Sequence, residues 1–428
     1  MHGLGKRTVF AGIVLAGLWV LAEGCAFLAF FRIDGRTFTW SRLLEEERKV
    51  GGKSTVQALG DLLARQTRRG TEYLHPYLGF FPLPEDLPKT EGIECLWIFD
   101  QAAYVFDSPL YRRREDTAVV AVTGGSVAYL FMQSGARLLQ ERLQSAPDFS
   151  ARKILFVAIC TGGFKQPQQM FGIEYLLALG AQFDLVINID GFNEVALHEA
   201  ENIKRDVFPI YPRNWFNRFQ GPPEFLPRMG EISYLRLKRV HVAARAERSW
   251  WRWSVLHHLL WKLRDLDFER DLLAKEEEFR NLKPQAGDVR ITGPSLRFED
   301  RSQLYDHLVD LWERCSRELH LLCLSHGIRY YHFLQPNQYF EGSKPLSEEE
   351  IETAWLEKSE FRKGVIAGYP KLIERGRKLQ DFGVGFHDLS GIFAEVSESL
   401  YIDNCCHFNE RGNQILAEAI AAAILTSR

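Results

Sequence analysis

The sequence lacks the cysteine patterns that mark metal sites and disulfide frameworks. Its seven cysteines are spread over 428 residues, and none forms a CxxC pair or a cysteine–histidine spacing typical of zinc sites. The chain is also too long and too poor in cysteine to depend on disulfides for its core. We therefore expect no metal and no cofactor. A disulfide between Cys160 and Cys405 or Cys406 stays open, beside free buried thiols.

Signals for nucleic acids and nucleotides are missing as well. Lys and Arg number 53 against 56 Asp and Glu, which gives a formal net charge of -3 without a dominant basic block. This balance argues against nucleic acid as the main partner. The sequence has no Walker A and no GxGxxG motif, which disfavours a nucleotide-binding protein.

What the sequence does have is one long apolar run near its N-terminus. Residues 8–31, TVFAGIVLAGLWVLAEGCAFLAFF, follow Lys6 and Arg7 and carry a single charge, Glu23. A membrane span needs ~20 apolar residues, and signal-peptide cores are shorter, at ~7–15 residues. We therefore predict an uncleaved single-pass anchor with its short N-terminus in the cytoplasm. A lipoprotein acylated at Cys25 fits less well, because the apolar run continues past this cysteine.

Glu23 is the unusual residue of this run. A carboxylate is unfavourable in lipid and can mark a contact with a membrane partner. It could equally lie off-centre and reach water near the headgroups. Both interpretations stay open at this point.

The rest of the chain alternates between strand and helix patterns. Such alternation predicts a parallel, doubly wound sheet covered by helices on both faces. We therefore predict an α/β fold with three layers, α/β/α, and a flavodoxin-like sheet of about five strands. The apolar runs of strand length lie at residues 117–123, 153–159, 183–189, 328–335 and 384–388.

This pattern divides the chain into three parts. Residues 1–31 form the cytoplasmic tip and transmembrane anchor, residues 32–116 a stalk and N-terminal extension, and residues 117–428 the α/β domain. We expect a helical insertion at about 195–300.

The insertion contains one amphipathic helical pattern, RSWWRWSVLHHLLWKL, at residues 248–263. Trp253, Leu256, Leu260 and Leu263 share one helical face. A helix that packs on the core is the favoured interpretation, and a lid or a helix on the membrane surface is the alternative.

Chemically useful residues follow the predicted strands, at the edge where parallel sheets bind ligands. Ser126 follows the first strand, Gly163 the second and Asn193 the third, and His407 lies near the C-terminus. Together they supply a nucleophile, oxyanion donors and a general base, which suffice for acyl transfer. Each also has a simpler explanation, namely a helix cap, a turn residue or a surface histidine.

This ordered set resembles the SGNH hydrolases, also called GDSL esterases and lipases, over most of residues 117–426. The resemblance implies that Ser126 attacks an ester carbonyl and that His407 accepts its proton and returns it to the leaving alcohol. It also implies an oxyanion hole formed by the N–H groups of Ser126 and Gly163 and the side chain of Asn193.

Two positions depart from the family pattern. Gly125 stands where the family often has Asp, and Asn404 stands three residues before the histidine, where the family places its acid. We predict that Asp403, one residue further back, completes the triad. A Ser126–His407 dyad is the alternative.

The resemblance implies a serine esterase or O-acyltransferase that works through an acyl-Ser126 intermediate. Acylated glycans of the envelope or of an exopolysaccharide, or lipid esters, are the expected substrates, because the anchor would hold the domain near a membrane. The domain would be extracytoplasmic, and periplasmic in a Gram-negative cell. The alternative is a catalytically inactive SGNH-like scaffold that binds a glycan or a membrane partner, which the irregular position of Asp403 favours.

Overall fold

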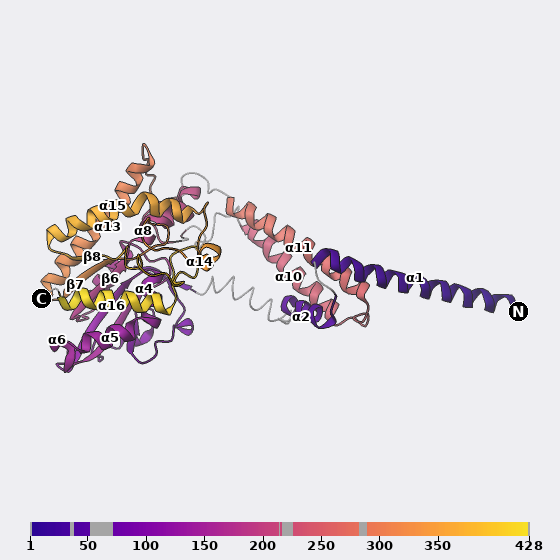
Figure 1. Ribbon diagram of the computed structural model, residues 1–428, viewed down its shortest axis with the longest axis horizontal. Coiled ribbons are helices and arrows are strands. Elements are labelled where there is room, and N and C mark those ends of the chain that lie inside the picture. The colour runs from indigo at the N-terminus through magenta and orange to yellow at the C-terminus, as the bar shows by residue number, and fades with distance from the viewer. Residues whose placement is uncertain are drawn as a thin grey trace. The chain divides into compact units, whose positions relative to one another are not determined.

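The chain forms two compact units (Figure 1). We call residues 70–219 and 283–428 the sheet unit, and residues 1–69 and 220–282 the helical unit. The computed structural model describes residues 2–34, 38–51, 72–213, 215, 226–281 and 289–426.

The sheet unit is built on six parallel strands in the order β3-β5-β4-β6-β7-β8. The five strands predicted from apolar runs are β4 to β8. Numbered along the chain, they follow the order 2-1-3-4-5, which is that of flavodoxin-like folds. The α/β class is therefore confirmed, with six strands in place of about five. The strands are β3 (Glu94–Trp97), β4 (Thr117–Gly124), β5 (Lys153–Cys160), β6 (Leu185–Asp190), β7 (Arg329–Leu334) and β8 (Gly385–Asp388).

The strand that sequence reasoning missed is β3. It has only four residues, ECLW, and pairs with β5 at one edge of the sheet. Its short length and partly exposed pattern leave no continuous apolar run to recognise. The sheet thus begins before residue 117, where we expected the α/β domain to start. A two-stranded hairpin, β1 (Glu72–His75) and β2 (Gly79–Pro82), also belongs to this unit.

Helices cover both faces of the sheet, so the layers are helix, sheet and helix (Figure 1). One helical layer consists of α4 (Ser126–Ser134), α5 (Ala136–Gln144) and α16 (Glu410–Thr426). The other consists of α7 (Gln168–Ala178), α8 (Phe192–Leu197), α13 (Arg301–Ser325) and α15 (Glu360–Phe382).

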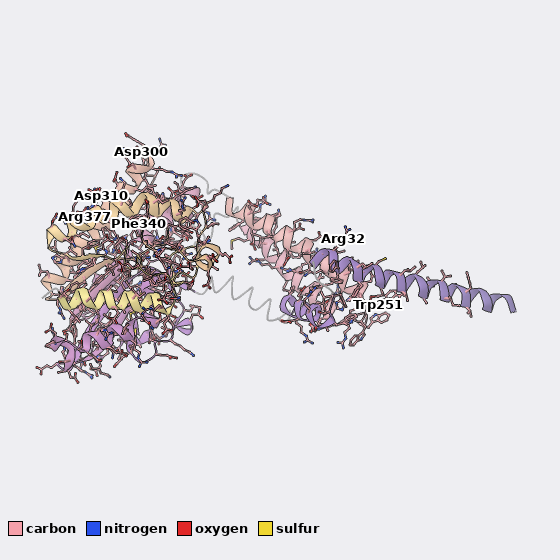
Figure 2. The ribbon with its side chains drawn as sticks, viewed as in Figure 1. Arg32, Trp251, Asp300, Asp310, Phe340 and Arg377 are labelled. Carbon is pink, nitrogen blue, oxygen red and sulfur yellow. The ribbon has the colours of Figure 1, made fainter. Side chains whose placement is uncertain are left out.

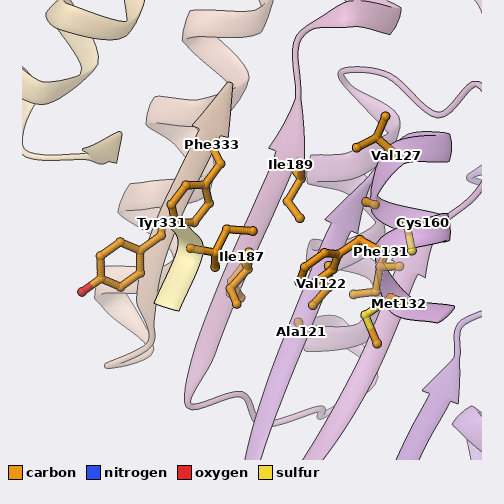
Figure 3. Packing of buried hydrophobic residues seen from close by; sticks show 14 of the residues in the cluster. Ala121, Val122, Val127, Phe131, Met132, Cys160, Ile187, Ile189, Tyr331 and Phe333 are labelled. Atoms are coloured by element: carbon orange, nitrogen blue, oxygen red, sulfur yellow. The ribbon is translucent and has the colours of Figure 1, made fainter. Parts of the chain in front are cut away.

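The core of the sheet unit lies between these layers. Every residue of β4 and of β6 is buried, as expected for strands covered on both faces. Figure 3 shows Val122 of β4, Phe131 of α4 and Ile187 of β6 among the packed side chains. Because β4 is held on all sides, the residue that follows it has a rigid support.

The helical unit contains α1 (His2–Asp34), α2 (Trp40–Gly51), α10 (Leu226–Glu247) and α11 (Val255–Asn281). α2 and α11 pack on α10, and α1 packs on α11. The insertion that we expected at about 195–300 is therefore divided. Residues 220–282 join α1 in the helical unit, whereas residues 195–219 and 283–300 belong to the sheet unit.

The expected apolar face of the insertion is not the buried one. Three of its four residues, Trp253, Leu260 and Leu263, are exposed. The buried face instead carries Trp261 and His258, whose Nδ1 lies 2.6 Å from a carboxylate oxygen of Glu47 on α2. The difference arises because α2, which sequence spacing could not place, supplies a polar partner for the other side of α11.

Glu23 finds its partner within the same unit. Its carboxylate accepts hydrogen bonds from the Ser254 hydroxyl and from the N–H groups of Val255 (2.6 Å) and Leu256 (3.3 Å) at the start of α11. A carboxylate at a helix N-terminus satisfies N–H groups that the helix itself leaves unpaired. Within the described residues, Val9–Ile33 of α1 is the one helix long and apolar enough to cross a membrane.

Candidate active site

The predicted site residues come from loops at the carboxyl ends of neighbouring strands. Ser126 directly follows β4 and Gly125, Gly163 follows β5, and Asn193 lies just after β6. β4 pairs with both β5 and β6, so these three loops meet at one edge of the sheet. This is the point where the strand order reverses, and where doubly wound sheets bind their ligands.

Ser126, His407 and Asp403 form one chain of hydrogen bonds. The Ser126 Oγ lies 2.7 Å from Nε2 of His407, and the His407 Nδ1 lies 2.5 Å from Oδ2 of Asp403. The two ring nitrogens thus have different partners, one hydroxyl and one carboxylate. This is the geometry in which an imidazole can take a proton from the serine while the carboxylate holds the other N–H.

A tight turn explains how Asp403 reaches His407 from four residues away. The second carboxylate oxygen, Oδ1, accepts hydrogen bonds from the N–H groups of Cys405 (2.9 Å), Cys406 (3.2 Å) and His407 (3.3 Å). The chain therefore winds around the carboxylate. Asn404 takes part through its backbone, because its carbonyl accepts a hydrogen bond from the Tyr339 hydroxyl at 2.9 Å.

The electrostatics of Asp403 agree with a carboxylate role. Partial burial alone would raise its pKa. The hydrogen bond and charge of His407, with the N–H groups of Cys405 and His407, outweigh this effect and hold the pKa of Asp403 below its usual value. Asp403 is thus ionised at neutral pH beside the imidazole.

The segment after β7 supports the acid loop, and sequence reasoning missed it. The side-chain amide of Asn337 donates to the carbonyl of Cys405 (3.1 Å), and that of Gln338 donates to the carbonyl of Asp403 (2.9 Å). The stretch QPNQY at residues 335–339 is polar and follows a predicted strand. The rule that located the other loops could therefore have located this one.

Ser126 does not cap its helix. The N-cap of α4 is Gly125, and Ser126 is the first helical residue. The N–H of a first helical residue has no acceptor within the helix. Ser126 thus combines a hydroxyl held by His407 with an N–H available at the same position.

Asn193 lies between the loop after β4, which contains Gly125, and the loop after β5, which contains Gly163 and Phe164. It is buried, and its Nδ2 donates to the carbonyl of Phe164 at 2.6 Å. A Cβ at position 125 would lie 2.0 Å from this Nδ2 and 3.2 Å from the Phe164 carbonyl oxygen, so a side chain there would displace the Asn193 amide. Gly163 has a positive φ of 79°, and a Cβ there would lie 2.2 Å from Cδ of Arg213.

A buried carboxylate fixes the shape of these loops from below. Glu194 accepts hydrogen bonds from the N–H groups of Gly191 (2.9 Å) and Gln166 (3.0 Å) and from Nε2 of Gln169 (3.1 Å). Burial, together with the charge of Asp190, raises the pKa of Glu194 to about 8. It connects the loop after β5 with the loop after β6 and has no contact with Ser126.

Two cysteines flank the histidine. The sulfur atoms of Cys405 and Cys406 are 3.6 Å apart, and both thiols are free, as is Cys160. The two sulfurs and a His407 nitrogen lie within 4.8 Å of one another, which is a spacing that a soft metal ion could use. Burial raises the pKa of the Cys406 thiol well above its usual range, which disfavours the thiolate that a metal needs.

Comparison with known proteins gives structural neighbours only. No protein-family model matches the chain, and no curated protein matches it. A GDSL-like lipase from Bacteroides thetaiotaomicron shares 8% identity at a TM-score of 0.35, with 77% of this chain and 97% of that chain covered. A catalytic mutant of an acetylxylan esterase from Geobacillus stearothermophilus shares 11% identity at a TM-score of 0.32, with 72% and 94% covered.

Both neighbours carry names of the class that the sequence resemblance predicts.

Proposed function

We propose that this protein is a membrane-anchored serine esterase of the SGNH type, with Ser126 as nucleophile, His407 as general base and Asp403 as the acid. The observation that carries the proposal is the continuous chain of hydrogen bonds from the Ser126 hydroxyl through the imidazole to Asp403. A scaffold without catalytic function would have no need for this alignment.

The proposed reaction has two halves. The Ser126 Oγ attacks the carbonyl carbon of an ester while His407 Nε2 takes the hydroxyl proton, and a tetrahedral oxyanion forms. The intermediate collapses to acyl-Ser126, and the imidazolium returns the proton to the departing alcohol oxygen. A water molecule or a sugar hydroxyl then attacks the acyl carbon with the same assistance from His407, and Ser126 is regenerated. Asp403 holds the imidazole in the required tautomer throughout.

The oxyanion would be stabilised by the N–H groups of Ser126 and Gly163 and by the Asn193 amide. Support comes from the position of the Asn193 amide, which lies directly over Gly125 and against the carbonyl of Phe164. Each oxyanion donor typically contributes a factor of ~10²–10³ in rate.

The anchor guides the choice of substrate. The apolar helix Val9–Ile33 would cross a membrane, with Lys6 and Arg7 on the cytoplasmic side and the sheet unit outside the cytoplasm. We infer that the ester is an O-acylated glycan of the envelope or of an exopolysaccharide, or a lipid ester. Extraction of cell membranes with alkaline carbonate tests the anchor, because an integral span stays in the pellet.

A fluorophosphonate probe tests the nucleophile. The full chain should be labelled covalently at Ser126, and it should hydrolyse a soluble acetyl ester such as 4-nitrophenyl acetate. The Ser126→Ala variant should lose both signals, whereas Ser134→Ala, at the other end of α4, should keep both. Absence of labelling in the wild type, or equal labelling of both variants, would contradict the proposed nucleophile and favour a catalytically inactive scaffold.

A separate experiment identifies the acceptor of the acyl group, which is either water or a sugar hydroxyl. Hydrolysis releases free acid from a donor ester, whereas transfer moves the acyl group onto an added oligosaccharide. Mass spectrometry of the oligosaccharide distinguishes the two, and the ratio of the products decides between an esterase and an O-acyltransferase.

A further inference from the structure

A basic cavity of about 540 Å³ lies between α10 and α11 in the helical unit. Lys238, His241 and Arg245 of α10 line one side of it, and His257 and Arg264 of α11 line the other. Mostly apolar and aromatic side chains complete the lining, and the described residues that form it include no aspartate or glutamate. We call this cavity the α10–α11 groove. Its volume is in the range of ordinary ligand sites.

The α10–α11 groove differs from the rest of the two helices in how its Lys and Arg side chains are paired with carboxylates. Most of the described Lys and Arg side chains of α10 and α11 have a carboxylate within ion-pair distance. These are Arg228, Arg236, Arg239, Lys262, Arg270 and Lys275.

The exceptions are grouped in space. All three of the remaining described cations of these helices line the groove, namely Lys238, Arg245 and Arg264. Lys238 lies 5.7 Å from the ring centroid of Tyr234, and none of the three cations has a carboxylate partner among the described residues. Three such cations around a concave, largely apolar surface favour an anionic ligand with an apolar part.

The turn between α10 and α11 is held on the anchor. The ring centroids of Trp19 and Trp251 are 5.1 Å apart, and Glu23 caps the start of α11. Figure 2 labels Trp251 in this turn. The apolar span covers Val9–Ile33, and Trp19 and Glu23 lie within it. A membrane that α1 crosses would therefore reach the turn and the end of the groove next to it.

The side chains of the turn suit contact with lipid. Trp250 is 80% exposed and Trp253 is 68% exposed, and the guanidinium of Arg252 lies 4.8 Å from the Trp253 ring centroid. Tryptophan is enriched where headgroups meet acyl chains, and arginine beside it can reach the headgroups.

We propose that the α10–α11 groove binds the phosphate headgroup of an anionic phospholipid from the membrane that α1 spans. The phosphate would lie among Lys238, Arg245 and Arg264, and an acyl chain would follow exposed Leu260 toward the tryptophans of the turn. This inference rests on the proposed membrane anchor and is independent of the ester chemistry. The bound lipid would fix the height and orientation of the helical unit at the membrane surface.

Quenching of tryptophan fluorescence by brominated lipids tests the proposal. The full chain is placed in phosphatidylcholine nanodiscs that contain a small fraction of brominated phosphatidylglycerol or, in parallel, brominated phosphatidylcholine. The wild type should bind the anionic lipid in preference to the neutral one. Each basic residue near a membrane contributes about fivefold in affinity, since its share is ~1 kcal/mol. The triple variant Lys238→Gln, Arg245→Gln and Arg264→Gln should therefore lose a preference of up to the order of 100-fold.

A matched triple variant separates the groove from overall charge. Arg236→Gln, Arg270→Gln and Lys275→Gln removes the same charge from the same two helices, at positions with carboxylate partners. This variant should keep the preference for the anionic lipid. Circular dichroism verifies that both triple variants keep their helical content.

Three results would overturn the proposal. The first is an equal preference in the wild type and both triple variants, and the second is an equal loss in both. The third is displacement of the lipid by millimolar glycerol phosphate, which would assign the groove to a free phosphate compound. Failure of the chain to enter nanodiscs would overturn the anchor and this inference together, while hydrolysis of a soluble ester by the same protein would still stand.

Discussion

Replacement of Gly125 by alanine tests the proposed oxyanion hole with a single methyl group. The new Cβ would lie 2.0 Å from Nδ2 of Asn193 and 3.2 Å from the carbonyl oxygen of Phe164. Favourable contacts between heavy atoms need ~3.5–4.0 Å. The amide must therefore move by more than about 1 Å, and it loses its 2.6 Å hydrogen bond to Phe164.

The expected result is a loss of catalysis without a loss of fold. Removal of one oxyanion donor lowers the rate by ~10²–10³, equivalent to ~2.7–4 kcal/mol of transition-state stabilisation. We expect this decrease in kcat for a soluble acetyl ester, with a smaller change in KM and with unchanged circular dichroism. Gly162→Ala is the matched control, because a Cβ there meets nothing within 4 Å. It should retain nearly full activity.

A double-mutant cycle identifies the cause. Asn193→Ala removes the amide that the methyl group would strike, so Gly125→Ala should have little further effect in that background. If Gly125→Ala lowers kcat by the same factor with and without Asn193, the clash is not the reason. If it has no effect in the wild type, the Asn193 amide is not an oxyanion donor.

Three further predictions concern the acid and the core. Asp403→Asn should lower kcat by ~10⁴, which is the effect of replacing the acid in a serine-protease triad. Asn404→Asp should leave kcat near the wild-type value. The opposite result, a large loss for Asn404→Asp and little for Asp403→Asn, would place the acid position at residue 404. Because the pKa of Asp403 is lowered in the folded state, its stabilising contribution is present above its unfolded pKa of about 4 and is lost as pH falls through the lower folded value. The urea stabilities of the wild type and Asp403→Asn should therefore differ at pH 6 and converge at acidic pH, and a constant difference would contradict the pairing. Phe131→Ala should lower the free energy of unfolding by ~3–5 kcal/mol in urea denaturation, because this side chain is fully buried, whereas exposed Phe106→Ala should change it little.

Much of the sheet unit could be predicted from local pattern. Continuous apolar runs marked β4 to β8 because strands covered on both faces have no polar side. Parallel strands place their carboxyl ends at one edge, so the convergence of Ser126, Gly163 and Asn193 followed from order alone. The same rule did not extend to β3, since a four-residue edge strand carries too few apolar residues for a period to be visible.

Other features depended on groups that are remote in sequence. Spacing alone left Asp403 and Asn404 in competition, and the turn of N–H groups around the Asp403 carboxylate decided between them. Glu23 was consistent with either lipid headgroups or another protein until α11, more than two hundred residues away, supplied its N-terminus.

The sequence by itself determined the fold class, the long apolar helix near the N-terminus and the strand ends that carry the proposed chemistry, because periodicity and apolar runs are local properties of a chain. The tertiary structure alone decided which acid faces His407, how closely the Asn193 amide approaches Gly125, and which described Lys and Arg side chains of α10 and α11 have no carboxylate partner. These outcomes depend on distances between side chains brought together by folding, and no sequence spacing contains those distances.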